Sequence, residues 1–484
     1  MTATTSSPAQ RTRLLARNFE VTSNQLLVAA LLISAGLSAL SLVFDHAIDY
    51  DPEGWIVYGR ELLGSQALNT SGFPAWKPLP AIVIAPFTLL TRGEGDVYYW
   101  LFITRASSVL TVFAAASLAN KFGGRVAALL AGFMVVVSPW WLGDGAVGRD
   151  SSLSAVLFAG AFLAHYRGRY KWSVVSLVGL ALLRPEATPF ILVYGFWMWR
   201  TRRLQWWFTV GAIGVIALLW LVPTILHSGL SAASISLNSG GHNAAVNSRF
   251  PFLTVIVDAA KQTHEIPALL VVVAVLASLY GLVMRWRAAG WQIGGRRGRG
   301  AVSQQTQASG IETQGTLLWG RSGEELLLLG AALAWVLIVA AETQKGYAGN
   351  PRYLVPAVAV FCATGSVAAV RLAGSRLTAR VIPSPRVALS AVAAVVLIGT
   401  AAFAVHALKS GVQLVQHRDH QVVAMRQELA QMDCPADRVV ANESNNAYLA
   451  QITGRPLQTT VNWHLPYLWF KNGNFWFLYC SPGP

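Results

Sequence analysis

The sequence contains little charge and especially little acid. Of its 484 residues only 12% are charged, whereas 54% are hydrophobic, and 37 Lys and Arg outnumber 22 Asp and Glu. A soluble protein of this length would interleave more charge with its apolar residues. Apolar runs at 26–44, 266–284 and 387–404 instead each hold about 20 uncharged residues, the length of a helix that crosses a bilayer. The chain is therefore predicted to be an all-α polytopic membrane protein.

Cysteine is scarce as well: the chain has three, Cys362, Cys434 and Cys480. Their spacing fits no metal-ligand motif. Cys434 and Cys480 would form a disulfide or stay unpaired in an oxidising compartment, and the spacing does not decide between the two. The net charge of +15 does not predict nucleic-acid binding, because the basic residues sit in short clusters between apolar runs. The positive-inside rule produces such a placement in membrane proteins.

These basic clusters also predict the topology. The protein is expected in the inner membrane of the cell. Its N-terminus is expected in the cytoplasm, because the first apolar run is preceded by Arg11, Arg13 and Arg17. Placing the later clusters on the same side predicts eleven membrane helices and an extracytoplasmic C-terminus. The expected spans are 25–44, 97–119, 126–141, 152–166, 172–183, 187–199, 206–226, 266–284, 325–341, 354–370 and 387–405.

Two apolar segments need separate treatment. The run 79–90 is too short to span and is expected to be interfacial or re-entrant. The run 172–199 has basic clusters at both ends, so it is expected to leave and return, with Arg184-Pro185-Glu186 at its outer tip. The expected domains are a cytoplasmic tail 1–24, a membrane domain 25–405 with a flexible cytoplasmic linker 290–315, and an extracytoplasmic segment 406–484.

The first outer loop is rich in acid. Four carboxylates fall within nine residues, namely Asp45, Asp49, Asp51 and Glu53. Pro52 after Asp51 predicts a helix with Asp51 as its N-cap and proline at the first helical position. Trp55, Tyr58 and Leu62 follow at helical spacing, which predicts an interfacial helix lying on the membrane. Asp51 is then either a cap alone or a cap that also takes part in chemistry.

Further polar residues are expected on the same outer side. Lys77, fixed between Trp76 and Pro78, could hold a lipid phosphate or simply reach toward the interface. An arginine inside a membrane segment, such as Arg105, is costly and indicates function. The other outer candidates are Asp144, Asp150, Arg184, Glu186, Arg352 and Tyr353. Acids together with cations at a bilayer surface suit a lipid-linked phosphate leaving group and an acceptor hydroxyl that loses a proton.

The ordered set of motifs resembles the glycosyltransferase C superfamily over about residues 25–370, and within it the protein O-mannosyltransferases and the lipid A aminoarabinose transferases. The motifs are the acid-rich loop ending in Tyr58-Gly59-Arg60-Glu61-Leu62-Leu63, Lys77-Pro78, Arg105, Asp150, 179–186 and Pro351-Arg352-Tyr353-Leu354-Val355-Pro356.

The resemblance implies roles for three of these residues. It implies that Asp51, nine residues before Arg60, is the catalytic carboxylate, that Lys77 holds the lipid phosphate, and that Arg105 is important in the following span. The chain departs from the pattern in having Pro52 and Gly54 where those families carry Glu and Arg. Arg105 or Arg184 is therefore expected to supply the missing phosphate contact.

The resulting hypothesis is a membrane glycosyltransferase that moves a sugar from a polyprenyl-phosphate donor to a glycan, lipid or protein acceptor in one inverting displacement. Asp51 and Asp150 are the catalytic candidates, and Lys77, Arg105 and Arg184 are the phosphate ligands. The substrate-binding candidates are Asp49, Glu53, Glu186, Arg352 and Tyr353. No cofactor is required, although Asp51, Asp144 and Asp150 could instead hold a divalent metal. A transporter or lipid flippase, and an envelope scaffold, are the alternatives from other classes.

Overall fold

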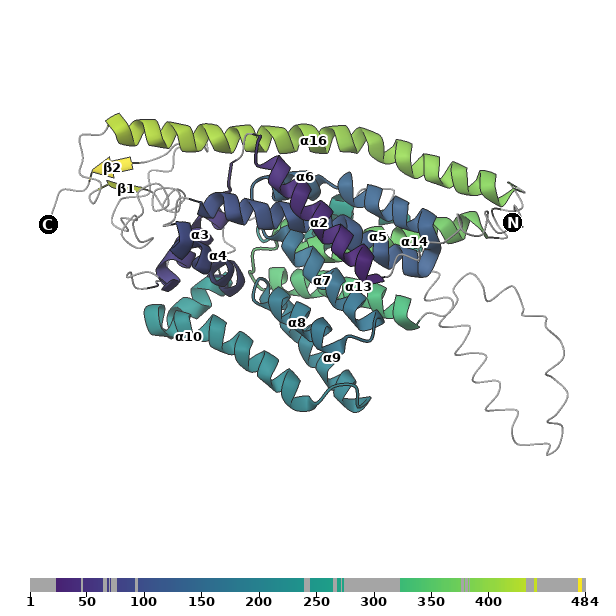
Figure 1. Cartoon of the computed structure of the whole chain (residues 1–484), viewed down its shortest axis with the longest axis horizontal. Coiled ribbons are helices and arrows are strands. Elements are labelled where there is room, and N and C mark those ends of the chain that lie inside the picture. The colour runs from purple at the N-terminus through teal and green to yellow at the C-terminus, as the bar shows by residue number, and fades with distance from the viewer. Residues whose placement is uncertain are drawn as a thin grey trace, which may run out of the picture.

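The chain is helical almost throughout its described part (Figure 1). The computed structural model describes residues 23–44, 47–63, 68, 70, 76–91, 95–238, 244–263, 268–270, 272–273, 323–375, 378, 382, 384–431, 439–441 and 478–480. The α-helices are α2 (Ser23–Ser41), α3 (Tyr50–Leu63), α4 (Pro78–Thr91), α5 (Asp96–Val136), α6 (Pro139–Ala146), α7 (Ser151–Tyr166), α8 (Tyr170–Ala181), α9 (Thr188–Arg200), α10 (Trp206–Asn238), α11 (Pro251–Thr263), α13 (Gly323–Gln344), α14 (Val355–Ala373) and α16 (Pro385–Gln431). Two 3-10 helices, η1 (Pro185–Ala187) and η3 (Pro351–Leu354), and one antiparallel strand pair, β1 (Val439–Ala441) with β2 (Leu478–Cys480), complete these elements.

Five of the described helical segments are long and apolar enough to cross a bilayer, which makes the chain an integral membrane protein. They are Asn24–Ser41, Asp96–Val136, Trp206–Leu226, Glu324–Gln344 and Pro351–Ala373. The eleven spans expected from the sequence are not confirmed. Helices α7, α8 and α9 coincide with three of them but have 16, 12 and 13 residues, fewer than the roughly 20 of a typical span. The span expected at 266–284 and the linker 290–315 lie almost wholly or wholly outside the described residues.

Glycines allow the central helices to bend and to pack closely. The spans expected at 97–119 and 126–141 belong largely to the 41-residue α5, which is interrupted at Gly124 with φ 75° and ψ −170°. That positive φ is accessible to glycine at little cost. A Cβ at the preceding Gly123 would lie 3.2 Å from Cγ2 of Val367 on α14. Small residues thus let α5 approach α14, as is common between membrane helices.

Helix α14 is the centre of the core. Within the segment Pro351–Ala373, 89% of the most apolar stretch is buried inside the protein. Figure 1 shows α5, α7, α13 and α14 together in the middle of the molecule, with α3 and α4 to one side and α8, α9 and α10 below. The helix pair expected at 172–199 is present as α8 and α9, with η1 at the break between them. The short apolar helix expected near 79–90 is present as α4, with Pro86 inside it.

Helix α3 differs from expectation in two respects. Its first backbone hydrogen bond runs from N–H of Glu53 to the carbonyl oxygen of Asp49, 3.2 Å away, so the helix begins earlier and Asp51 lies in its first turn instead of capping it. Trp55 and Tyr58 are 0% exposed. An interfacial position for this helix is therefore not confirmed: the aromatic side chains expected to face lipid are packed inside the protein, where Trp55 meets Trp100 edge-on at 5.9 Å.

Helix α16 has 47 residues and continues through the boundary expected between a last span, 387–405, and an outer segment. It lies along one side of the molecule in Figure 1, and it packs on α6 and α14. Strand β2 contains Cys480, whereas Cys434 lies outside the described residues, so the choice between a disulfide and two unpaired cysteines is left as in the sequence analysis.

Candidate active site

The centre of the candidate site is the carboxylate of Asp150, which bridges two cations. Its Oδ2 accepts a hydrogen bond from Nζ of Lys77 at 2.6 Å, and its Oδ1 accepts one from Nη2 of Arg184 at 2.7 Å. Asp150 and Arg184 are 0% and 1% exposed. Three segments far apart in the sequence thus meet: the start of α4, the start of α7, and the break between α8 and α9.

Burial and charge act on these groups in opposite directions. Burial disfavours the charged form of Asp150, but Arg184 and Lys77 outweigh it and hold the pKa of Asp150 below its usual range. Burial, reinforced by Arg184, lowers the pKa of Lys77 to about 8, with Asp150 opposing the change. The ammonium of Lys77 also lies 4.5 Å from the ring centroid of Trp55. Lys77 is therefore a cation that a change of a unit or two in pH can discharge.

A second ion pair lies beside the first. Arg352, at the start of η3, donates from Nη2 to Oδ2 of Asp51. Both arginines approach the ring of Tyr353, whose centroid is 4.1 Å from the guanidinium carbon of Arg184 and 5.7 Å from that of Arg352. We refer to Asp51, Lys77, Asp150, Arg184 and Arg352 as the ion-pair cluster.

Arg149 is a residue of the site that sequence reasoning did not assign. Its Nε lies 2.5 Å from Oδ2 of Asp49 and its Nη1 lies 2.9 Å from Oδ1 of Asp144. Ser151 Oγ donates to the second oxygen of Asp144 at 2.6 Å. Asp49 and Asp144 are thus occupied in joining the first loop to the turn before α7. The signal in the sequence was an arginine directly before Asp150 in an outer loop.

Two glutamates expected to bind substrate lie in different surroundings. Glu53 is 3% exposed, and burial raises its pKa to about 8 although Arg60 and Arg426 oppose this, so it is mostly neutral at pH 7. Glu186 is 2% exposed, and neither of its carboxylate oxygens has a hydrogen-bond partner among the described residues. Burial raises the pKa of Tyr347, and the charge of Glu186 raises it further.

Arg105 lies apart from the ion-pair cluster in its contacts. Its Nη1 donates to the carbonyl oxygen of Ser41 at 2.9 Å, and its Nη2 donates to that of Ala146 at 3.0 Å. It therefore joins the ends of α2 and α6. These contacts do not support the expected role in phosphate binding and instead indicate that Arg105 holds two helices together.

The ion-pair cluster is suited to an anion. Nε of Arg184 and Nε of Arg352 are buried and have no hydrogen-bond partner in the described part of the chain. A buried N–H without an acceptor is costly, and guanidinium groups match phosphate oxygens in geometry and charge. Among the described residues no three His, Cys, Asp or Glu side chains gather as a metal site would require. The residues expected as metal ligands, Asp51, Asp144 and Asp150, are each paired with a cation.

Comparison with known proteins finds relatives only among solved structures. No family model and no curated protein matches the sequence. The chain is similar to the crystal structure of ArnT from Cupriavidus metallidurans bound to undecaprenyl phosphate, with 15% identity, a TM-score of 0.45, and coverage of 91% of this chain and 77% of that one. It is also similar to the apo oligosaccharyltransferase of Archaeoglobus fulgidus, with 16% identity, a TM-score of 0.40, and coverage of 81% and 56%.

ArnT is a lipid A aminoarabinose transferase. Identities of 15% and 16% and TM-scores of 0.45 and 0.40 are too low to transfer an activity.

Proposed function

We propose that this chain is a membrane glycosyltransferase that transfers a sugar from a polyprenyl-phosphate donor to an acceptor hydroxyl on the extracytoplasmic side of the inner membrane. The observation that supports it most is the pair of buried guanidinium Nε atoms, on Arg184 and Arg352, that lack an acceptor. Both guanidinium groups approach one ring, that of Tyr353, and Asp150 pairs with Arg184 as well as with the ammonium of Lys77. A phosphate at this place would accept hydrogen bonds from the two free N–H groups and lie among three positively charged side chains.

The reaction is a single displacement. The acceptor oxygen attacks the anomeric carbon, the bond from that carbon to the phosphate oxygen breaks, and the polyprenyl phosphate leaves with the bonding electrons. Lys77, Arg184 and Arg352 stabilise the negative charge on the leaving phosphate. Asp51 takes the proton of the acceptor hydroxyl as general base. One displacement inverts the anomeric configuration.

The two catalytic aspartate candidates then have different roles. The side chain of Asp51 is 23% exposed and has one cationic partner, Arg352, whereas that of Asp150 is 0% exposed and has two. Asp150 is permanently ionised and held on both oxygens, so it positions Lys77 and Arg184 instead of accepting a proton. When the donor phosphate attracts Arg352, Asp51 becomes available as the base. Glu186, with two free acceptor oxygens, is placed to bind sugar hydroxyls.

Sugar transfer by the purified protein in nanodiscs tests this proposal, with a panel of polyprenyl-phosphate monosaccharides as donors. Asp51→Asn is expected to keep binding of polyprenyl phosphate and to slow transfer by about 10²–10⁴-fold, the usual loss of a general base. Asp258→Asn is the matched control, because Asp258 lies on α11 and pairs only with Lys261, at 3.6 Å, among its described ion pairs. Transfer at the wild-type rate by Asp51→Asn would refute the base assignment. Absence of transfer from every donor, together with wild-type behaviour of all variants in cells, would favour a scaffold.

A further inference from the structure

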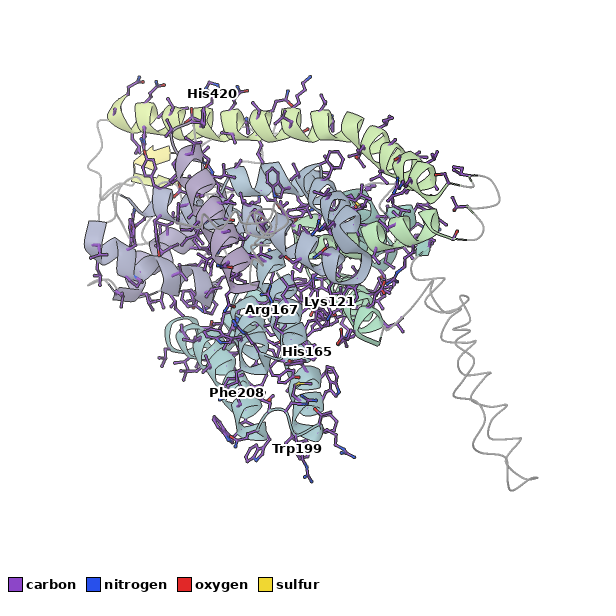
Figure 2. All side chains as sticks on the ribbon, turned by 45° about the vertical axis from the view of Figure 1, so that its right-hand side comes forward. Lys121, His165, Arg167, Trp199, Phe208 and His420 are labelled. Atoms are coloured by element: carbon purple, nitrogen blue, oxygen red, sulfur yellow. The ribbon has the colours of Figure 1, made fainter. Side chains whose placement is uncertain are left out.

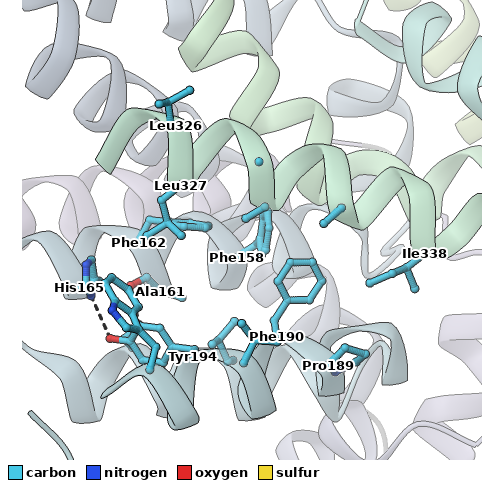
Figure 3. Close-up of a pocket in the computed structure, with 17 residues that line it drawn as sticks. Phe158, Ala161, Phe162, His165, Pro189, Phe190, Tyr194, Leu326, Leu327 and Ile338 are labelled. Carbon is cyan, nitrogen blue, oxygen red and sulfur yellow. Dashed lines mark hydrogen bonds between the residues drawn. The ribbon is translucent and has the colours of Figure 1, made fainter. Parts of the chain in front are cut away.

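A cavity lies in the membrane domain, between α7, α8, α9 and α13 (Figure 3). Its volume is about 420 Å³, and its lining is almost wholly aliphatic and aromatic. In Figure 3 the rings of Phe158, Phe162 and Phe190 lie along it, and α13 forms the facing wall. The main polar feature is at one end, where Nδ1 of His165 is 3.1 Å from the hydroxyl of Tyr194. An apolar cavity of this kind is suited to hydrocarbon and not to a sugar or a phosphate.

Aromatic rings separate this cavity from the ion-pair cluster. The ring of Trp335 lies 5.3 Å from that of Phe158 and 5.7 Å from that of Phe190, centroid to centroid. On the side of the site, Nε1 of Trp335 donates to the carbonyl oxygen of Tyr353 at 2.8 Å. Arg184 lies on the ring of Tyr353. A ligand in the cavity therefore contacts the side of this aromatic layer that faces away from the ion-pair cluster. It does not occupy the proposed donor phosphate site.

The cavity is accessible from the surface that faces lipid. Three residues that line it are exposed: Val193 at 71%, Trp197 at 38% and Leu327 at 37%. Val193 and Trp197 lie on α9 and Leu327 lies on the membrane span α13. In a bilayer these side chains meet acyl chains, so the cavity opens toward hydrocarbon and not toward water.

Cations predominate at the polar end of the cavity, where the acid Glu324, at the start of α13, is paired with Lys121 at 3.0 Å. His165 comes fifteen residues after Asp150, so at 1.5 Å per residue along α7 it lies about 22 Å from the ion-pair cluster. The segments 165–171 and 199–203 contain six exposed cations and no acid, namely Arg167, Arg169, Lys171, Arg200, Arg202 and Arg203. Arg203 donates to the hydroxyl of Tyr170 at 3.2 Å, and the ring of Tyr170 lies 5.6 Å from that of His165. Figure 2 shows Arg167 near His165.

We propose that this cavity binds one acyl chain of an anionic phospholipid, whose headgroup lies among these exposed cations. The apolar lining suits the acyl chain, and the lateral opening lets that chain enter from the bilayer. The cations at the mouth suit the negatively charged headgroup. Basic residues at one membrane face bind anionic headgroups in this way. The bound lipid is distinct from the sugar donor, whose phosphate belongs at the other end of α7.

The test fills the cavity. Gly330 lines it, and a Cβ at Gly330 would have no atom within 4 Å, so Gly330→Leu enters the cavity without disturbing the helix. Gly214→Leu on α10 is the matched control, since a Cβ there also meets nothing within 4 Å and Gly214 does not line the cavity. Purified, delipidated protein is titrated with phosphatidylglycerol, and separately with phosphatidylcholine of the same chains, and the bound lipid is counted by native mass spectrometry.

Wild type and Gly214→Leu are expected to bind one phosphatidylglycerol, and Gly330→Leu at least tenfold more weakly. The combined variant R200Q/R203Q is expected to lose most of the preference for phosphatidylglycerol over phosphatidylcholine. Undiminished binding by Gly330→Leu would overturn the proposal, as would equal affinity of the wild type for the two lipids. Stoichiometric displacement of phosphatidylglycerol by polyprenyl phosphate would also overturn it, because the cavity would then belong to the donor. These measurements contain no sugar donor, so their outcome is independent of the transferase assignment.

Discussion

Asp150→Asn should be the most damaging single substitution in the site. The wild-type carboxylate is 0% exposed and compensates two cations at 2.6 and 2.7 Å, Lys77 and Arg184. The amide retains one oxygen acceptor but no charge, so at least one buried cation loses its partner. Removing one member of a buried ion pair costs about 3–5 kcal/mol of stability. We expect a loss of that size in the free energy of unfolding.

Lys77→Met should be milder, because it leaves Asp150 paired with Arg184 in a one-to-one ratio. Loss of a hydrogen bond between charged groups costs roughly 1.5–3 kcal/mol. In the double variant Lys77→Met/Asp150→Asn only Arg184 remains uncompensated. Its loss of unfolding free energy should therefore be smaller than the sum of the losses in the two single variants. The three variants therefore form a cycle that measures the coupling between Lys77 and Asp150.

Unfolding in detergent, followed by heat and by denaturant, measures these differences. Because the folded pKa of Asp150 is depressed, its stabilisation is present above the unfolded pKa of about 3.9 and is lost as the pH falls through the folded value. The gap between wild type and Asp150→Asn should thus be constant from about pH 5 to 7, where Lys77 stays charged, and narrow below about pH 4. The reasoning is refuted if Asp150→Asn unfolds like wild type, or if Lys77→Met costs as much as Asp150→Asn.

Three further predictions concern individual side chains. The pKa of Lys77 is lowered to about 8, so binding of polyprenyl phosphate should weaken as the pH rises through that value. The variant Lys77→Arg stays charged and should bind equally at pH 7 and pH 9. If binding by wild type and variant changed with pH in the same way, Lys77 would be excluded as a phosphate ligand. Glu186→Gln should raise the KM for the sugar donor and leave binding of sugar-free polyprenyl phosphate unchanged, since the free oxygens of Glu186 are assigned to the sugar. Equal losses of affinity for both ligands would contradict that assignment. Arg105→Met should lower the free energy of unfolding by about 1.5–3 kcal/mol, because its hydrogen bonds to two carbonyl groups are lost, and it should leave the donor KM unchanged. A raised KM with normal stability would instead support the expected role of Arg105 in phosphate binding.

Much of the local structure followed from the sequence. Hydropathy runs predicted a helical membrane protein, the charges at both ends of 172–199 predicted the break at Arg184-Pro185-Glu186, and Lys77-Pro78 marked the start of a short apolar helix. These are local properties, because a run of apolar side chains must form internal backbone hydrogen bonds in lipid whatever its neighbours are. The same reasoning brought Lys77, Asp150, Arg184 and Arg352 forward as candidates.

Only the tertiary structure decided which of those residues meet and which of them are buried. Arg352 and Asp51 are 301 positions apart, and Lys77 and Asp150 are 73 apart, so no spacing could pair them. The periodicity of Trp55 and Tyr58 predicted a face but not whether lipid or protein would cover it, and packing placed both in the interior. Arg105 was costly enough in a membrane helix to indicate function, but its carbonyl acceptors come from α2 and α6. Charge pairing and burial depend on how helices pack, and packing is a property of the whole chain.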